Sequence, residues 1–239
     1  MRNLRFVIEY DGTNFYGWQY QPNKRTIQGE IEDALKKITN ENIKIIGAGR
    51  TDQGIHALGQ IANFHTSTPL DTEQIKRGVN SLVREDIYVK KIEEVGSTFN
   101  SRYSAKSKIY RYHITLEPSP FKMRYNWFVK YSLQLSAIRK VIPYVVNEHD
   151  FKNFSVCDGN HNTRCNVNNV NLTQNGSQII IEIEGDRFLR KMVRRVIGFM
   201  VDVGRGRFSP HNTDDVFAGK IQEIYFAPPQ GLFLVEVKY

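Results

Sequence analysis

The pattern of apolar positions predicts a mixture of strands and helices in the first half of the chain. Every second residue from Leu4 to Tyr10 is apolar or aromatic, which is typical of a strand with one buried face. From residue 27 onward apolar residues recur at helical spacing, and Thr26 is a suitable N-cap for that helix. We also expect strands at 43–46, 61–65 and 87–92, and a helix capped by Thr72.

The second half has a similar order of elements. The alternation from Lys108 to Leu116 predicts a strand that places Tyr110 and Tyr112 on one face. Helices are predicted at 136–146 and 188–203, and strands at 167–172, 178–184 and 231–239. The asparagine-rich region 157–169 lacks a period and is expected to be a loop. This order suggests two α+β halves related as a pseudo-repeat, with a boundary near Arg102–Ala105.

Composition narrows the class of protein. The chain has 239 residues, of which 40% are hydrophobic and 24% charged, as in an ordinary folded domain. Its net charge of +8 favours polyanionic partners such as nucleic acid or an acidic membrane surface, although a basic protein without such a partner fits as well. No apolar run approaches membrane-spanning length and the N-terminus lacks a signal-peptide segment, so we expect a cytoplasmic protein.

Several classes of chemistry have no support in the sequence. The two cysteines, Cys157 and Cys165, do not form a Cys-x-x-Cys pair, which argues against a disulfide framework or a cysteine zinc site. His56 has no neighbouring ligand cluster and is interpreted as structural or substrate-facing rather than as a metal ligand. The motifs of phosphate loops, dinucleotide-binding turns and serine nucleophile elbows do not occur.

The run Gly47–Ala57 contains the first candidate site. Three glycines surround Arg50 and Asp52, which indicates a tight loop, and an arginine two residues before an aspartate can keep the carboxylate charged. A surface turn with a side-chain hydrogen bond would explain the aspartate equally well. Asp52 lacks the second carboxylate that glycoside hydrolysis usually needs, so a catalytic Asp52 would act as nucleophile or charge stabiliser with another group elsewhere.

Basic residues crowd the start of the helix predicted at 188–203. These residues would share one arc of a helix. They are Arg187, Arg190, Lys191, Arg194 and Arg195. A solvated polar face is the ordinary explanation for such a run. Because every charge here is positive, a polyanion or a buried carboxylate is expected to face them. Tyr110 lies on a strand flanked by further cations, a combination that suits the binding of unstacked bases.

Several separated motifs resemble those of the TruA family of tRNA pseudouridine synthases, in the same order and over nearly the whole chain. The segment Gly49–Ala57 resembles the active-site signature of that family. The other matching segments are Glu9–Gly12, Tyr16–Gln19, Thr26–Gln28, Arg102–Ala105, Tyr110–Tyr112, Asp150–Phe154, Phe188–Arg194 and Ala227–Leu232. Departures occur at 162–166 and 219–226, away from the matched catalytic positions.

The resemblance implies an isomerase that turns uridine in RNA into pseudouridine without a cofactor or metal. By this resemblance Asp52 is the catalytic carboxylate and Tyr110 stacks on the extruded uracil. Arg50 would fill the space of the displaced base, and Arg194 would pair with Asp52. Further substrate-binding roles are expected for the remaining candidates, which are His56, Arg190 and Lys191.

The resemblance also implies an architecture and a substrate. Two pseudo-symmetric α+β halves are expected, 1–103 with the catalytic loop and 104–239 with the tyrosine strand and basic helix. Each half would be a mainly antiparallel sheet with helices on one face, and the active-site cleft would lie between the halves. The expected enzyme is a homodimer acting on uridines 38 to 40 in the anticodon stem-loop of tRNA. A non-catalytic RNA-binding protein of the same fold is the alternative.

Overall fold

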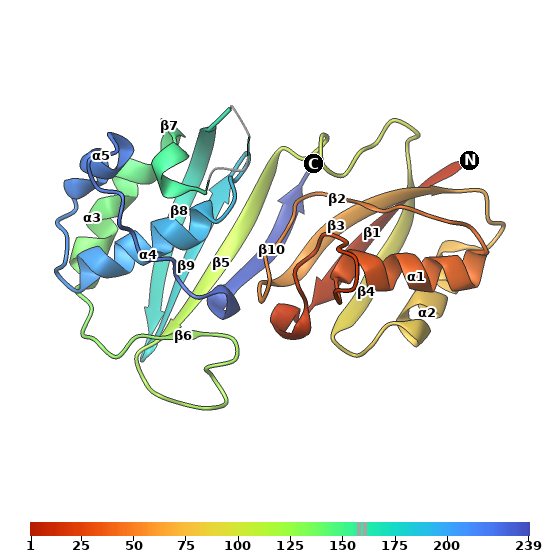
Figure 1. The fold of residues 1–239 in the computed structure, drawn as a ribbon, viewed down its shortest axis with the longest axis horizontal. Coiled ribbons are helices and arrows are strands. Elements are labelled where there is room, and N and C mark those ends of the chain that lie inside the picture. Colours follow the sequence, from red (N-terminus) through yellow and green to blue (C-terminus); the bar gives the residue numbers. More distant parts are fainter. Residues whose placement is uncertain (157–158, 160–161) are drawn as a thin grey trace. The chain divides into compact units, whose positions relative to one another are not determined.

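The computed structural model describes residues 1–156, 159 and 162–239, and the chain divides into two compact units (Figure 1). The first unit comprises Met1–Lys106 together with Phe233–Tyr239, and the second comprises Ser107–Leu232. The predicted mixture of helices and strands is confirmed. The expected boundary at 103/104 falls close to Lys106, while the last strand, which we expected in the second half, is grouped with the first unit.

The first unit is built on a sheet with the strand order β4-β1-β3-β10. Its strands are β1 (Arg2–Tyr10), β2 (Ile46–Gly47), β3 (His56–Thr66), β4 (Ile87–Val95) and most of β10 (Leu232–Lys238). Its helices are α1 (Ile27–Thr39) and α2 (Thr72–Leu82), and a single turn, η1 (Gly12–Asn14), follows β1. β2 adds to β3, and β10 runs parallel to β3 with Phe233 opposite His56.

Local sequence signals explain where the helices of this unit begin. The Thr26 hydroxyl accepts a hydrogen bond from the Gly29 amide at 3.2 Å, as the predicted N-cap requires. The second helix is capped by Asp71 rather than by Thr72, because Asp71 and Gln74 form a reciprocal capping box. Both helices therefore start at the first apolar turn.

The strand predicted at 43–46 is much shorter in the structure. Only Ile46 and Gly47 join the ladder to β3. The amide of Ile45 instead donates to Glu32 Oε1 at 3.0 Å, and Gln28 Nε2 donates to the Ile45 carbonyl at 3.3 Å. Because two polar side chains of α1 satisfy this backbone, the segment does not need a partner strand.

The main strands of the second unit follow the order β5-β9-β8-β7, with antiparallel neighbours. Its strands are β5 (Ser107–Thr115), β6 (Trp127–Phe128), β7 (Asn147–Asp150), β8 (Arg164–Asn175) and β9 (Gln178–Gly185). Its helices are α3 (Leu135–Val145), α4 (Met192–Gly204) and α5 (Asn212–Phe217), with single turns η2 (Lys152–Phe154) and η3 (Pro229–Gly231). The short β6 runs parallel to the end of β5.

Two predictions for the second unit are wrong. The expected loop at 157–169 is a strand from Arg164 onward, and a bulge between Val167 and Asn169 breaks the alternation that would have revealed it. Cys157, at the start of that expected loop, lies outside the described residues. The helix predicted from residue 188 begins at Met192, because Lys191 has a φ of 60° and a left-handed residue cannot continue an α-helix.

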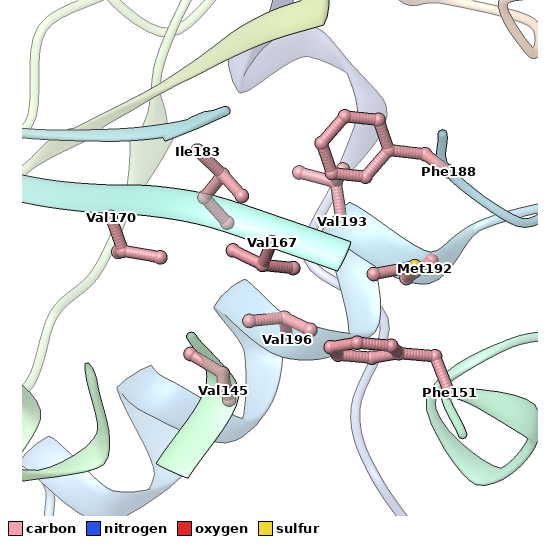
Figure 2. A pocket seen from close by; sticks show the side chains of 9 residues that line it. All are labelled: Val145, Phe151, Val167, Val170, Ile183, Phe188, Met192, Val193 and Val196. Atoms are coloured by element: carbon pink, nitrogen blue, oxygen red, sulfur yellow. The ribbon is translucent and has the colours of Figure 1, made fainter. Parts of the chain in front are cut away.

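Apolar side chains fill the space between the sheet and helix α4 in the second unit. Figure 2 shows Val167, Val170 and Ile183 of the strands facing Met192 and Val196 of the helix. The gap among them is too narrow to admit water, so it is core packing rather than a ligand site. Among the described residues, no helix is long and apolar enough to cross a bilayer.

Candidate active site

The Asp52 loop lies between β2 and β3 and is tied to the segment that follows β1. The carbonyl of Thr51 accepts a hydrogen bond from the Trp18 amide at 3.0 Å, and the Asp52 carbonyl accepts one from the Ile55 amide at 3.2 Å. These bonds fix the backbone on both sides of the carboxylate. The Asp52 side chain is half-buried and that of Arg50 is exposed.

Two glycines allow this close approach. A Cβ at Gly12 would lie 2.0 Å from the Ile55 carbonyl oxygen, and one at Gly17 would lie 2.6 Å from the Thr51 oxygen. Gly17 also has a φ of +91°, which residues with a Cβ rarely adopt. Backbone therefore packs directly on backbone at both ends of the loop, with no side chain between.

Buried polar side chains support the loop from beneath. The hydroxyls of Tyr10 and Thr51 are 2.8 Å apart, and Gln60 Nε2 donates to the Gly49 carbonyl at 2.9 Å. Burial raises the pKa of Tyr10 well above its usual range, so this hydroxyl keeps its proton. A neutral hydroxyl is suited to holding the loop and is a poor base.

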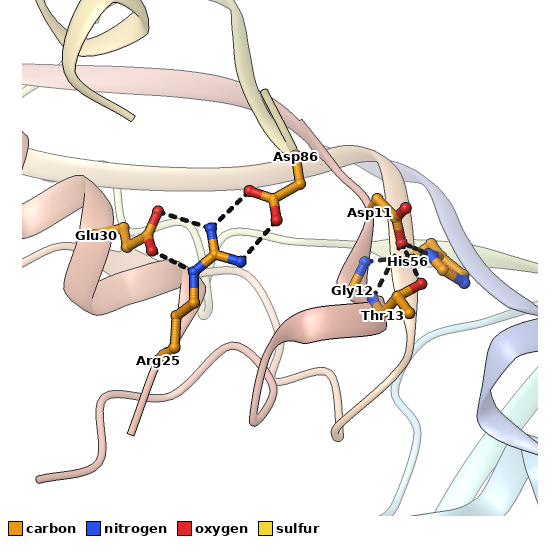
Figure 3. Close-up of polar contacts among 7 residues, drawn as sticks. All are labelled: Asp11, Gly12, Thr13, Arg25, Glu30, His56 and Asp86. Atoms are coloured by element: carbon orange, nitrogen blue, oxygen red, sulfur yellow. Dashed lines mark hydrogen bonds and ion pairs between the residues drawn. The ribbon is translucent and has the colours of Figure 1, made fainter. Parts of the chain in front are cut away.

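His56 is buried, with 1% of its surface exposed, at the end of the loop. Its Nδ1 lies 3.1 Å from both the Gly12 amide nitrogen and Asp11 Oδ1, and its ring stacks on Phe233 at 4.6 Å. When Nδ1 carries no proton, it accepts a hydrogen bond from the Gly12 N–H. When Nδ1 is protonated, it donates to Asp11 instead (Figure 3). Of the two roles considered for His56, these contacts favour the structural one.

A second polar cluster holds the segment after β1 to its surroundings. Arg25 pairs with Asp86 at 2.7 Å and with Glu30 at 2.5 Å (Figure 3). Its guanidinium lies 4.0 Å from the centre of the Phe15 ring. The hydrogen bonds to Asp86 raise the pKa of Arg25 further above its already high value. The Asp86 carbonyl also accepts the Asp11 amide at 3.0 Å, which connects this cluster to the partner of His56.

One local expectation for the loop is not met. In the described part of the chain, Arg50 and Asp52 form no ion pair, although they are two residues apart. Their loop is closed by main-chain bonds instead, and Arg50 extends from it to the surface. Arg50 is thus available to a ligand rather than engaged in holding the carboxylate.

In the second unit Tyr110 lies on β5, opposite Ile183 of β9. The side chain is largely buried, with 7% exposed, and its ring meets Phe188 edge to face at a centroid distance of 5.1 Å. Such packing fixes the plane of the tyrosine ring. Phe188 reaches this position from the irregular segment that precedes α4.

Arg194 lies in the first turn of α4 and is joined to the segment before β10. Its Nε donates to the Ala227 carbonyl at 2.6 Å, and its own carbonyl accepts the Ala227 amide at 3.0 Å. Nearby, the Tyr112 hydroxyl donates to the Pro228 carbonyl at 2.7 Å. Burial raises the pKa of Tyr112 strongly, and the positive charge of Arg194 opposes part of that rise.

The neighbouring cations do not share one helical face, contrary to our expectation. Arg195 Nη1 donates to the carbonyls of Asn153 and Ser155, both at 2.9 Å, and burial lowers the pKa of this arginine. Arg195 is therefore a structural residue. Arg190 and Lys191 precede the helix; Arg190 is exposed, and the Lys191 ammonium lies 5.3 Å from the centre of the Phe226 ring.

The predicted site residues thus form two groups, one in each compact unit. Asp52, Arg50 and His56 belong to the first, while Tyr110 and the cations before and within α4 belong to the second. Sequence reasoning did not assign roles to the residues that hold these groups, which are Tyr10, Asp11, Gln60, Phe188 and Ala227. Three of the matching motifs, Glu9–Gly12, Phe188–Arg194 and Ala227–Leu232, contained four of these residues and were the available signal.

Comparison with known proteins identifies the family. A family model described as tRNA pseudouridine synthase matches residues 6–104 and 144–239, which is most of the chain. The chain belongs to this family. It is 42% identical to tRNA pseudouridine synthase A of Caldicellulosiruptor saccharolyticus, over 100% of both chains. Identity is 43% with the enzyme of Thermosipho melanesiensis, over 98% of this chain and 99% of the relative, and 38% with that of an Exiguobacterium strain, over 100% and 98%.

Proposed function

We propose that this protein is an isomerase that converts uridine to pseudouridine in tRNA. The observation that carries the proposal is the full-length similarity to tRNA pseudouridine synthases, with a family model whose two matched ranges include the positions of Asp52 and Arg194. The excess of basic residues suits a polyanionic substrate. Uridine must leave its stack before any group can reach the glycosidic bond.

The reaction breaks the bond from uracil N1 to ribose C1′ and forms one from C5 to C1′, after which C5 loses its proton and N1 gains one. Asp52 acts at C1′, either by attacking it or by stabilising the positive charge that develops there. A half-buried carboxylate on a loop fixed by main-chain bonds is suited to this task, because the loop already holds it in place and little conformational entropy is lost when the substrate binds.

The other candidates act on the base and the backbone of the RNA. Tyr110 stacks on the extruded uracil, with the edge contact to Phe188 fixing the ring plane. Arg194 pairs with Asp52 and helps to keep it ionised. The exposed Arg50 fills the space left by the base, and Arg190 and Lys191 contact phosphates. His56 supports the loop by its contacts to Gly12 and Asp11.

We further propose that the targets are uridines 38 to 40 of the anticodon stem-loop, that the enzyme acts as a homodimer, and that it works in the cytoplasm. These statements rest on the resemblance of the motifs to the TruA family. The pseudo-symmetry of the halves and a cleft between them stay predictions of the same kind.

Mapping of modified positions on a tRNA pool tests the proposal. Unmodified tRNA is incubated with the protein, and each uridine that has become pseudouridine is located by mass labelling. We expect modification confined to positions 38 to 40. Salt-dependent tRNA binding without any pseudouridine would favour the non-catalytic RNA-binding alternative, and failure to bind tRNA would contradict both readings.

A further inference from the structure

The segment between β5 and α3 exposes aromatic side chains to an unusual degree. Phe121 is 91% exposed, Tyr131 48% and Tyr125 38%, and Tyr225 is 50% exposed. Isolated exposed rings are common on soluble proteins, but several on one short segment mark an interaction site. We call the residues Phe121, Arg124, Tyr125, Lys130, Tyr131 and Tyr225 the aromatic–cationic surface; all belong to the second unit.

The second half of this segment is attached to the sheet. β6 pairs with β5 through Trp127 opposite Ile114, and the Val129 amide donates to the Thr115 carbonyl at 3.0 Å. Just before this attachment the loop is closed on itself, since Asn126 Nδ2 donates to the Lys122 carbonyl at 2.8 Å. The aromatic rings are therefore presented from a supported loop.

Cations alternate with the rings. The Arg124 guanidinium lies 5.5 Å from the centre of the Tyr125 ring, and the Lys130 ammonium lies 5.3 Å from that of Tyr131. Arg205 approaches Tyr131 from the end of α4, at 5.4 Å. Where a cation lies beside an aromatic ring, the ring can stack on the π surface of a ligand and the cation can pair with its negative charge.

Two carboxylates lie close to cations of this region. Glu117 lies 3.8 Å from Lys122, and Asp202 pairs with Arg205 at 2.8 Å and with Arg207 at 3.2 Å. Among the described residues these two carboxylates thus serve three cations, and Lys130 adds to the positive charge. The surface is therefore both aromatic and positive, which are the two properties that single-stranded nucleic acid recognises.

The surface is continuous with the surroundings of Arg194. Tyr225 stacks on Trp127 at 5.6 Å, and Trp127 meets Tyr112 edge to face at 6.2 Å. Tyr225 lies two residues before Ala227, whose carbonyl accepts the Nε of Arg194. RNA bound next to Arg194 would therefore reach Tyr225 and the loop.

We propose that the aromatic–cationic surface binds unpaired nucleotides of the tRNA outside the target uridine, by stacking bases on its rings and pairing phosphates with its cations. This proposal rests on the proposed function for the identity of the RNA. A second copy of the chain is a poorer occupant, because a symmetric contact would place one positive surface against another. The surface would contribute to tRNA affinity and leave the chemical step unchanged.

The test compares the double variant Phe121→Ala/Tyr131→Ala with Tyr88→Ala, which removes a ring of similar exposure (55%) from β4 of the first unit. The dissociation constant for tRNA is measured at several salt concentrations, turnover is measured at saturating tRNA, and the oligomeric state is measured by sedimentation. We expect the double variant to bind tRNA about tenfold more weakly, with unchanged saturated turnover and sedimentation, and Tyr88→Ala to match wild type.

A charge variant, Lys122→Gln/Lys130→Gln, examines the cations. We expect its binding to depend less steeply on salt than that of wild type. Unchanged tRNA affinity in the double variant would overturn the proposal, and so would a change in sedimentation that accounts for the weaker binding. If wild type binds tRNA but makes no pseudouridine, the proposed function fails while the binding comparison still decides on this surface.

Discussion

The Asp52 loop and the surroundings of Arg194 are held by different kinds of contact. Main-chain atoms confine the first, through the Trp18–Thr51 bond and the approach of Gly12 and Gly17 to facing carbonyl oxygens. Guanidinium groups organise the second, where Arg194 and Arg195 each donate to carbonyls of other segments. A long side chain can be replaced without moving the backbone, whereas a glycine packed on a carbonyl cannot.

This difference separates two demands on the site. A carboxylate that acts on one carbon must be placed to a fraction of an ångström, and backbone contacts achieve this. Cations that meet an RNA backbone tolerate more freedom, so flexible side chains suffice. We therefore expect substitutions in the first region to act through geometry and those in the second to act through the individual charge removed.

Apart from Asp52 itself, the largest effect is expected at Arg194. Arg194→Met removes the cation proposed to pair with Asp52, and we expect the turnover rate to fall by about 10²–10³-fold, the usual effect of losing one electrostatic stabiliser. Single-turnover kinetics at saturating tRNA measure it. A rate within a factor of two of wild type would remove Arg194 from the catalytic step.

Gly12→Ala is the corresponding change in the first region. Its Cβ would meet the Ile55 carbonyl at 2.0 Å, so the loop must move, and we expect about 100-fold lower turnover together with a lower melting temperature. Gly96→Ala is the matched control, since nothing lies within 4 Å of a Cβ there. Equal behaviour of the two alanine variants would contradict the close packing described for the loop.

Arg195→Met should behave in the opposite way to its neighbour Arg194. The substitution leaves the carbonyls of Asn153 and Ser155 without their charged donor, and we expect a loss of about 2 kcal/mol in the free energy of unfolding. Turnover of the folded variant should stay near that of wild type. Urea denaturation and steady-state kinetics measure the two quantities, and a catalytic defect without a loss of stability would reverse the assignment.

The smallest effect concerns Tyr10 and its pH dependence. Tyr10→Phe removes the hydrogen bond to Thr51, which we expect to cost about 1 kcal/mol at neutral pH. Because burial raises the pKa of Tyr10, the unfolded chain loses this proton first above pH of about 10, and alkaline pH then favours unfolding. The stability difference between wild type and variant should shrink above that pH. A constant difference between pH 8 and 11 would argue against the raised pKa.

Much of the fold could be predicted because its signals are local. The cap at Thr26 and the alternation through Tyr110 and Tyr112 each lie within a few residues of the element that they define. One error arose where a distant group intervenes. Glu32 takes the amide of Ile45 away from a strand. The late start of α4 has a local cause instead, since the left-handed Lys191 interrupts a pattern that is otherwise typical of a helix.

The candidate site shows the same limit. Asp52 and Arg50 could be singled out because glycines and charges are concentrated around them. The contacts that hold the loop join residues far apart in the sequence, such as Gly12 with His56 and Tyr10 with Thr51, and no local pattern encodes them. The role of Arg195 was misjudged for the same reason, since its carbonyl partners lie about 40 residues away.

The most direct measurement is pseudouridine formation by Asp52→Asn. The substitution keeps the size of the side chain and the main-chain bonds of the loop but removes the negative charge. We predict that the variant folds and binds tRNA like wild type, while pseudouridine in the treated tRNA falls by at least about 10³-fold. Turnover comparable to that of wild type would contradict the catalytic role of Asp52 and, with it, the mechanism proposed for this protein.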